Sequence, residues 1–141
     1  MPNILNRSII IAALIIVFLD AGSAMAEVKV GFLGGFTGPL KSMTPAVYKA
    51  AKLAFKHVND QGGVLDNQKI IMPNADTTCA DTMLASKAAE KLVNSEKVVA
   101  LVGALCSSAT ISAAENVAIP SGVPLVSPAS TSPVVTILSC M

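Results

Sequence analysis

Short apolar runs alternate with longer amphipathic segments along residues 27 to 141, and Gly, Pro or Asn closes each run. The apolar runs predict strands, over residues 28–33, 69–74, 98–103 and 124–127. The amphipathic segments predict helices, over residues 45–59, 81–94 and from Ser107 or Ser108 to about residue 118. Strands that alternate with helices are typical of a parallel sheet with crossover helices. The pattern therefore predicts an α/β fold, a doubly wound parallel sheet with flanking helices.

Helical spacing also predicts which side chains face the sheet. In the first helix these are Val47, Ala50, Ala51, Ala54, Phe55 and Val58, and in the second they are Leu84, Ala88 and Leu92. The run at 98–103 has too few polar residues to face solvent on either side, so it is expected to be a buried strand. Pro73 near the end of the second predicted strand indicates an edge position or an early strand end.

The first 26 residues have the pattern of an export signal rather than of a folded element. A polar start with one positive charge, Met1 to Arg7, precedes the apolar run of residues 8–19. A helix of that run would reach only about 18 Å, which is short of the ~30 Å hydrocarbon core. Ala24-Met25-Ala26 fits the cleavage pattern, so we expect a signal peptide over 1–26, a mature start at Glu27 and a periplasmic protein; an uncleaved anchor is the alternative.

Composition and charge exclude several classes of protein. Apolar residues make up 52% of the chain, charged residues 13%, and the net charge is +1, which is unlike a disordered chain or a long coiled coil. From Glu27 onward there are nine Lys against eight Asp plus Glu, without a basic cluster. With no Trp and one Tyr, a base-stacking surface is also disfavoured. We therefore expect no nucleic-acid partner.

Candidate catalytic chemistry is sparse. The glycine-rich loop from Gly34 to Pro39 lacks the spacing of a dinucleotide or phosphate loop, which leaves a tight turn or a close backbone approach to another ligand as open interpretations. His57 is the only histidine and lies inside the first predicted helix, far from the third strand end where Cys106 would be a nucleophile. We expect a protein that is not an enzyme and that has neither cofactor nor metal.

Cys79 and Cys106 each follow a predicted strand, so both are expected at the carboxyl edge of the sheet. An exported protein meets an oxidising compartment, which favours a disulfide between them over two buried thiols. Cys140 is then the unpaired cysteine.

Hydroxyl side chains gather at the same edge, after the third strand (Ser107, Ser108, Thr110) and after the fourth (Ser127, Ser130, Thr131). Hydroxyls and the unpaired N–H groups of a helix start make a carboxylate site, and open α/β sheets bind ligands at this edge. Ordinary helix capping and loop polarity are the alternative.

Five segments carry a resemblance to a known family: Val28–Leu40, Asn59–Leu65, Ala75–Cys79, Val102–Thr110 and Val126–Pro133. In their order and spacing they resemble the leucine/isoleucine/valine-binding proteins, the type I periplasmic binding components of ABC importers. The resemblance covers about residues 28–135. It implies an amino acid ligand and a membrane permease as partners.

By that resemblance, the backbone of the amino acid is held by Ser107, Ala129 and Thr131. Met43 falls where the first loop supplies a wall for the ligand's side chain, a position that is aromatic in some family members. The Cys79–Cys106 pair also matches a disulfide of close relatives, whereas the partner for the ligand's ammonium comes from a second lobe.

Family members continue into that second lobe, so residues 27–141 resemble an incomplete N-terminal lobe, a truncated fragment. The sequence thus predicts an exported substrate-binding component of a branched-chain amino acid ABC importer. A ligand-sensing or interaction domain built on the same lobe is the alternative, and a thiol-dependent hydrolase is a distant third.

Overall fold

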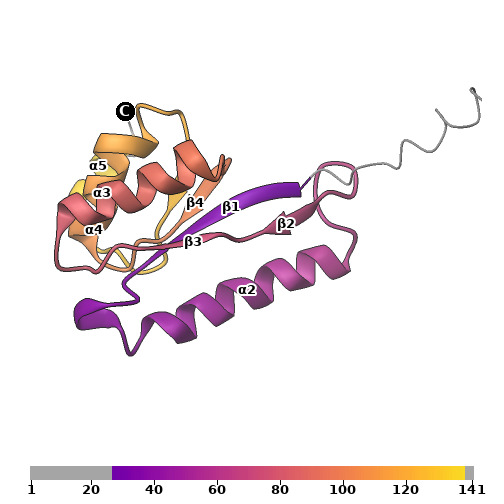
Figure 1. Ribbon diagram of the computed structural model, residues 1–141, viewed down its shortest axis with the longest axis horizontal. Coiled ribbons are helices and arrows are strands. Elements are labelled where there is room, and N and C mark those ends of the chain that lie inside the picture. Colours follow the sequence, from indigo (N-terminus) through magenta and orange to yellow (C-terminus); the bar gives the residue numbers. More distant parts are fainter. Residues whose placement is uncertain (1–26, 139–141) are drawn as a thin grey trace, which may run out of the picture.

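A parallel sheet runs through residues 27–138, the part of the chain that the computed structural model describes (Figure 1). β1 (Glu27–Gly34) pairs with β2 (Lys69–Ile71) and β3 (Asn74–Asp76), and also with β4 (Ala100–Val102), which in turn pairs with β5 (Leu125–Val126). All of these pairings are parallel, and the order β2-β1-β4-β5 confirms the predicted doubly wound α/β sheet. The predicted signal peptide, 1–26, and Cys140 lie outside the described residues.

The second predicted strand is split in two at Met72 and Pro73. β2 pairs with the first half of β1 and β3 with its second half, so the two short strands follow one another beside β1 (Figure 1). Proline has no N–H to give to a ladder, but the Pro73 carbonyl still accepts a hydrogen bond from the Phe32 amide at 2.8 Å. The strand at this edge therefore breaks without releasing β1, and the edge position that Pro73 predicted is confirmed.

Two helical segments cover one face of the sheet, and one helix covers part of the other (Figure 1). α3 (Thr82–Glu90) continues into the π-helical turn η2 (Lys91–Ser95), and α4 (Ser107–Ala113) continues into η3 (Ala114–Ala118). α2 (Thr44–Asp60) lies on the opposite face, against β1 and β2. Small side chains let α3 and α4 approach each other and the sheet. Together with Leu33, Leu92 and Leu101, the core contains the alanines of these two helices: Ala85, Ala88, Ala89, Ala109 and Ala113.

Two predicted inward faces need correction. Leu84 is 42% exposed, and Ala85 takes its place beside Ala88 and Leu92, because only a small side chain fits where α3 meets α4. Ala50 and Ala54 of α2 are exposed, since α2 lies mainly against β1 and β2 and buries a narrower stripe than its sequence offers.

Helix α5 (Pro133–Leu138) follows β5 and was not predicted. Its start has a recognisable signal, because Ser132 precedes a proline and its Oγ accepts a hydrogen bond from the Val134 amide at 3.4 Å. Among the helices of residues 27–138, none has the length and apolar character needed to cross a membrane.

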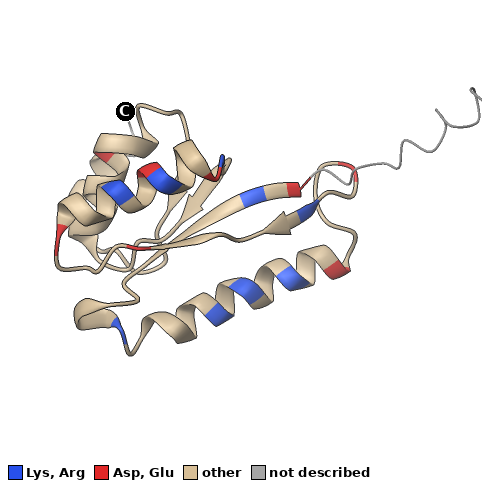
Figure 2. Ribbon diagram, viewed as in Figure 1, with Lys and Arg blue, Asp and Glu red and all other residues tan. Residues whose placement is uncertain are grey.

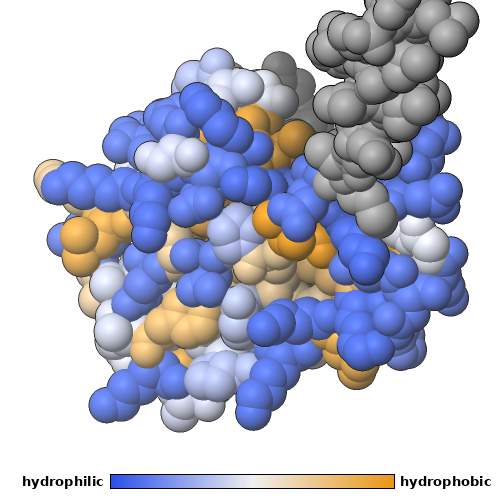
Figure 3. Space-filling view, turned by 45° about the vertical axis from the view of Figure 1, so that its right-hand side comes forward, coloured by the Kyte–Doolittle hydropathy of each residue, from blue (hydrophilic) through white to orange (hydrophobic). Residues whose placement is uncertain are grey.

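Charge is distributed unevenly along the chain (Figure 2). Lys49, Lys52 and Lys56 line α2, whereas no charged residue follows Glu115 in the sequence. Apolar side chains also reach the surface in patches between hydrophilic ones (Figure 3). Among the large apolar residues after Glu115, Val126 (67%) and Ile137 (63%) are the most exposed in the described part of the chain. The end of the molecule built from β5 and α5, residues 116–138, is called the neutral end below.

Candidate functional site

The two hydroxyl clusters predicted at the sheet edge meet in the structure. Ser107 is the first residue of α4, which follows β4 after a short loop. Thr131 lies in the loop after β5. The Ser107 Oγ accepts hydrogen bonds from the amides of Thr131 and Ser132, each at 3.2 Å. The strand order β4-β5 is what makes this contact, because neighbouring parallel strands end side by side.

Three of the predicted hydroxyls serve the loop itself. Ser127 donates to the Ala104 carbonyl at 2.7 Å, and its Oγ also accepts from the Ser130 amide at 3.0 Å. The Thr110 and Ser130 hydroxyls lie 2.7 Å apart. For these side chains the interpretation as loop polarity fits the structure, whereas the Thr131 and Ala129 residues of the same loop are exposed.

The start of α4 presents backbone N–H groups. Its N-cap residue is Cys106, whose backbone is extended and whose side chain makes no capping hydrogen bond. Amides of a first turn have no partner within the helix and carry a partial positive charge. Ser107 therefore joins a hydroxyl to a weakly electropositive backbone, a combination that suits a carboxylate.

The first loop, which leads from β1 through the short 3₁₀ turn η1 (Gly38–Leu40) to Met43, is held by a residue that sequence reasoning missed. Asp76, at the end of β3, accepts hydrogen bonds from the Phe36 amide (2.9 Å), the Thr37 amide (3.1 Å) and the Thr37 hydroxyl (2.5 Å). It also accepts from the Thr78 amide at 2.8 Å. Met43 itself is 61% exposed at the N-cap of α2.

These donors change the acidity of Asp76. Burial raises the pKa of the carboxyl, but the hydrogen bonds from the Thr37 hydroxyl and from the Thr78, Thr37 and Phe36 amides outweigh it and lower the pKa below its ordinary value. A lowered pKa in the folded state means that the ionised form stabilises the fold. That contribution is present above the unfolded pKa, about 4, and is lost as the pH falls through the folded value.

We therefore expect the stability advantage of the wild type over D76N to be constant above about pH 5 and to shrink as the pH falls below about 4. Asparagine stays neutral at every pH, so the part of the difference that changes with pH reports the ionisation of this carboxylate. Urea unfolding of both proteins across that range measures the difference. A difference that stays the same at both ends would show that the ionised form of Asp76 adds nothing.

The predicted disulfide is confirmed. Cys79 and Cys106 are bonded, with their Cα atoms 5.9 Å apart, and the bond joins the turn after β3 to the N-cap of α4. A bonded Cys106 is no nucleophile, and His57 is exposed on α2, so the interpretation of Cys106 and His57 as a hydrolase pair is wrong. Within residues 27–138, no group of three His, Cys, Asp or Glu side chains is arranged to hold a metal ion.

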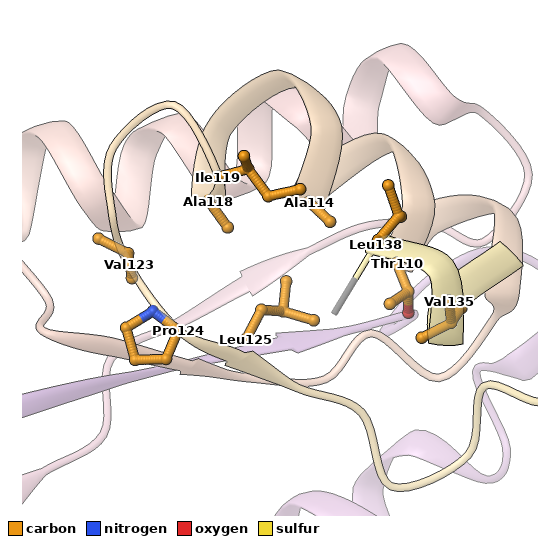
Figure 4. A pocket seen from close by; sticks show the side chains of 9 residues that line it. All are labelled: Thr110, Ala114, Ala118, Ile119, Val123, Pro124, Leu125, Val135 and Leu138. Carbon is orange, nitrogen blue, oxygen red and sulfur yellow. The ribbon is translucent and has the colours of Figure 1, made fainter. Parts of the chain in front are cut away.

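A cavity of about 350 Å³ lies beside the hydroxyl cluster but has a different character (Figure 4). It opens between α4, η3, β5 and α5, and aliphatic side chains such as Ile119, Leu125 and Leu138 point into it. Thr110 supplies a hydroxyl to its lining, and no charged side chain contributes. A free amino acid carries two charges that need polar partners, so this cavity is no site for one.

Comparison with known proteins places these features in a family. The family model described as periplasmic binding protein matches residues 27–136. An amino acid binding protein of Pseudomonas aeruginosa is 36% identical over 113 residues, which are 80% of this chain and 29% of that protein. A leucine-specific-binding protein of Salmonella typhimurium is 29% identical over 127 residues, 90% of this chain and 33% of that protein.

A solved structure of a protein with a similar description also matches this chain. The crystal structure of a branched-chain amino acid transporter substrate-binding protein from Streptococcus pneumoniae, in complex with isoleucine, superposes with a TM-score of 0.73 at 35% identity. The match covers 79% of this chain and 31% of that one. The chain thus spans about a third of the length of the relatives it matches.

Proposed function

Because the chain belongs to the periplasmic binding protein family, we propose that residues 27–141 form part of the N-terminal lobe of an exported amino acid binding protein. That protein serves as the substrate-binding component of a branched-chain amino acid ABC importer. The observation that carries the proposal is the contact between Ser107 and the Thr131 loop at the carboxyl edge of the sheet. The leucine-specific and isoleucine-bound relatives support the class of ligand.

Ser107 is the principal carboxylate ligand in this proposal. Its Oγ already accepts two amide hydrogen bonds, which use both lone pairs of the hydroxyl oxygen. The hydroxyl proton is left to donate a hydrogen bond to a bound anion. The first amides of α4 add donors to the same carboxylate. Thr131 contributes its exposed hydroxyl and Ala129 its backbone, and both follow β5.

Met43 supplies the wall for the ligand's side chain. The residue is exposed at the N-cap of α2, at the end of the loop that Asp76 holds. A thioether side chain is unbranched and apolar, so it adapts to aliphatic surfaces of different shape. Leucine, isoleucine and valine are the ligands that such a wall fits.

Residues 1–26 direct export in this proposal and are cleaved after Ala26, so the lobe acts in the periplasm. The protein performs no chemical reaction and needs no cofactor. It passes its amino acid to the membrane permease of the importer.

Ser107→Ala is expected to weaken amino acid binding about tenfold or more in a full-length family member that carries the same Cys-Ser-Ser-Ala-Thr segment. A hydrogen bond to a charged carboxylate contributes roughly 1.5 to 3 kcal/mol, and 1.4 kcal/mol is a factor of ten in affinity. Titration calorimetry with leucine measures the change. The Ser108→Ala variant is the matched control, because Ser108 is the exposed neighbour of Ser107; equal affinity in both variants would contradict the assigned role.

A further inference from the structure

The first loop rests on one short turn, residues 76–79, over most of its length. Beyond the hydrogen bonds to Asp76, the loop approaches the turn so closely that a side chain is excluded at Gly38 and crowded at Gly35. Gly38, at φ +76°, faces the Thr78 carbonyl, and a Cβ there would overlap it. A Cβ on Gly35 would lie 3.1 Å from the Cys79 Sγ.

The same turn is covalently joined to the start of α4. Cys79 is the last residue of the turn, and its disulfide partner Cys106 immediately precedes Ser107. A continuous path of short contacts therefore leads from Met43, through the loop and the turn, to Ser107. The loop and the helix start both take their positions from residues 76–79.

The carboxylate of Asp76 has no other task that competes with this one. Among residues 27–138 the ion pairs are Lys29–Glu96 and Lys56–Asp60, so Asp76 forms none there. Its Oδ1 accepts from Phe36 and Thr78, and its Oδ2 accepts from the amide and the hydroxyl of Thr37. With both oxygens occupied by donors from the loop and the turn, it is also unsuited to receive a ligand's ammonium.

We propose that Asp76 is a positioning residue of the amino acid site: its carboxylate fixes the first loop, and with it the Met43 wall, relative to Ser107. The inference rests on the proposed function. It goes beyond that function because the distance between Met43 and Ser107, the two ends of the ligand site, then depends on Asp76, which touches no ligand.

A carboxylate is required here because both oxygens must accept. An asparagine at this position has one acceptor oxygen and would turn an NH₂ group toward donors on the other side. D76N therefore loses one half of the contacts, D76A loses all of them, and T37V loses only the hydroxyl bond. The expected order of effect on the loop is D76A, then D76N, then T37V.

Amide hydrogen exchange on the oxidised full chain tests the anchoring of the loop without any ligand. In D76A the Phe36 and Thr37 amides are expected to exchange at least tenfold faster than in the wild type. D81A is the matched control, because Asp81 also accepts backbone N–H bonds, from Met83 and Leu84, but in α3 rather than in the loop. Unchanged exchange at Phe36 and Thr37 in D76A, or the same increase in D81A, would overturn the proposal.

A second measurement follows the two ends of the path with leucine as the probe. In the wild type, millimolar L-leucine is expected to shift both the Ser107 amide and the Met43 methyl signals in NMR spectra. In D76A the Ser107 shift persists, while the Met43 shift falls at least threefold. A Met43 shift as large as that of the wild type would overturn the positioning role.

The two measurements separate the two ideas. If leucine leaves the wild-type Ser107 signal unmoved, the proposed function fails, and with it the role of Asp76 in an amino acid site, whatever the exchange rates show. If Ser107 responds and the loop is unaffected by D76A, the function stands and the inference fails. Should D76A not fold, D76N and T37V give the same comparison with milder changes.

Discussion

On its own, the 141-residue chain is expected to bind leucine, isoleucine and valine only in the millimolar range, on the order of a thousandfold more weakly than a micromolar site. Its matched relatives are about three times as long, and the S. pneumoniae relative was crystallised with isoleucine. Ser107 and Thr131 offer donors for one end of the ligand, but Thr131 and Ala129 lie open to water. Hydrogen bonds that compete with water are individually weak.

The absence of a charged partner for the ligand's ammonium is expected to weaken binding more. Asp76 is the acidic residue nearest to the loop that carries Met43, and its oxygens are already engaged by chain donors. By resemblance to the family, the ammonium's partner belongs to a second lobe. Leaving one charge of a buried pair without its partner costs on the order of 2 to 5 kcal/mol, which accounts for most of the thousandfold difference.

Titration calorimetry on the soluble, oxidised chain with each of the three amino acids measures the affinity. A full-length family member, titrated under the same conditions, is the reference for a closed two-lobed site. A micromolar dissociation constant from the monomeric chain would show that one lobe is sufficient and would contradict this expectation.

Removing the disulfide is expected to cost about 3 to 4 kcal/mol of unfolding free energy, since Cys79 and Cys106 are 27 positions apart in the sequence and close a loop of about that size in the unfolded chain. A domain of this length has a total stability of about 5 to 15 kcal/mol, so the loss is a large fraction of it. The C79S/C106S variant also frees the turn at residues 76–79 from the start of α4.

Urea unfolding of the oxidised wild type and of C79S/C106S gives the difference in free energy. C140S is the control, because Cys140 is expected to be unpaired, and peptide mapping without reductant checks that expectation. Identical unfolding midpoints for the wild type and the double variant would contradict a stabilising role for the bond.

Much of the fold is predictable from local pattern. β1 and β4 come from runs rich in apolar residues, and a glycine marks the end of each run. The scarcity of polar residues at 98–103 also indicated an interior parallel strand, and β4 lies between β1 and β5. Pro73, which lacks an N–H donor, indicated an edge position or an early strand end, but it did not indicate that β3 would follow on the same side of β1. Which helix face is buried was less predictable, because the choice of Ala85 over Leu84 depends on the close packing of α3 against α4.

The site divides in the same way. Ser107 follows β4 and Thr131 follows β5, and these strands are neighbours. Once the strand order is predicted, the contact between the two residues follows from it. Asp76 could not be found, because its donors Phe36 and Thr37 lie 40 and 39 residues away in sequence and a lone acidic residue after a strand carries no signal of its own. Nor does the sequence distinguish a serine that supports its loop, such as Ser127, from one that faces a ligand.

The neutral end has a consequence for how this molecule behaves in concentrated solution. Within residues 27–138, β5 is the last strand on its side of the sheet, and natural edge strands usually carry charged side chains that keep other chains from pairing with them. β5 carries the exposed Val126 instead, and α5 carries the exposed Ile137. Two copies that approach through their neutral ends meet no charged side chain of residues 116–138, so we expect salt and pH to change such a contact little, whereas Val126→Lys places a charge on β5.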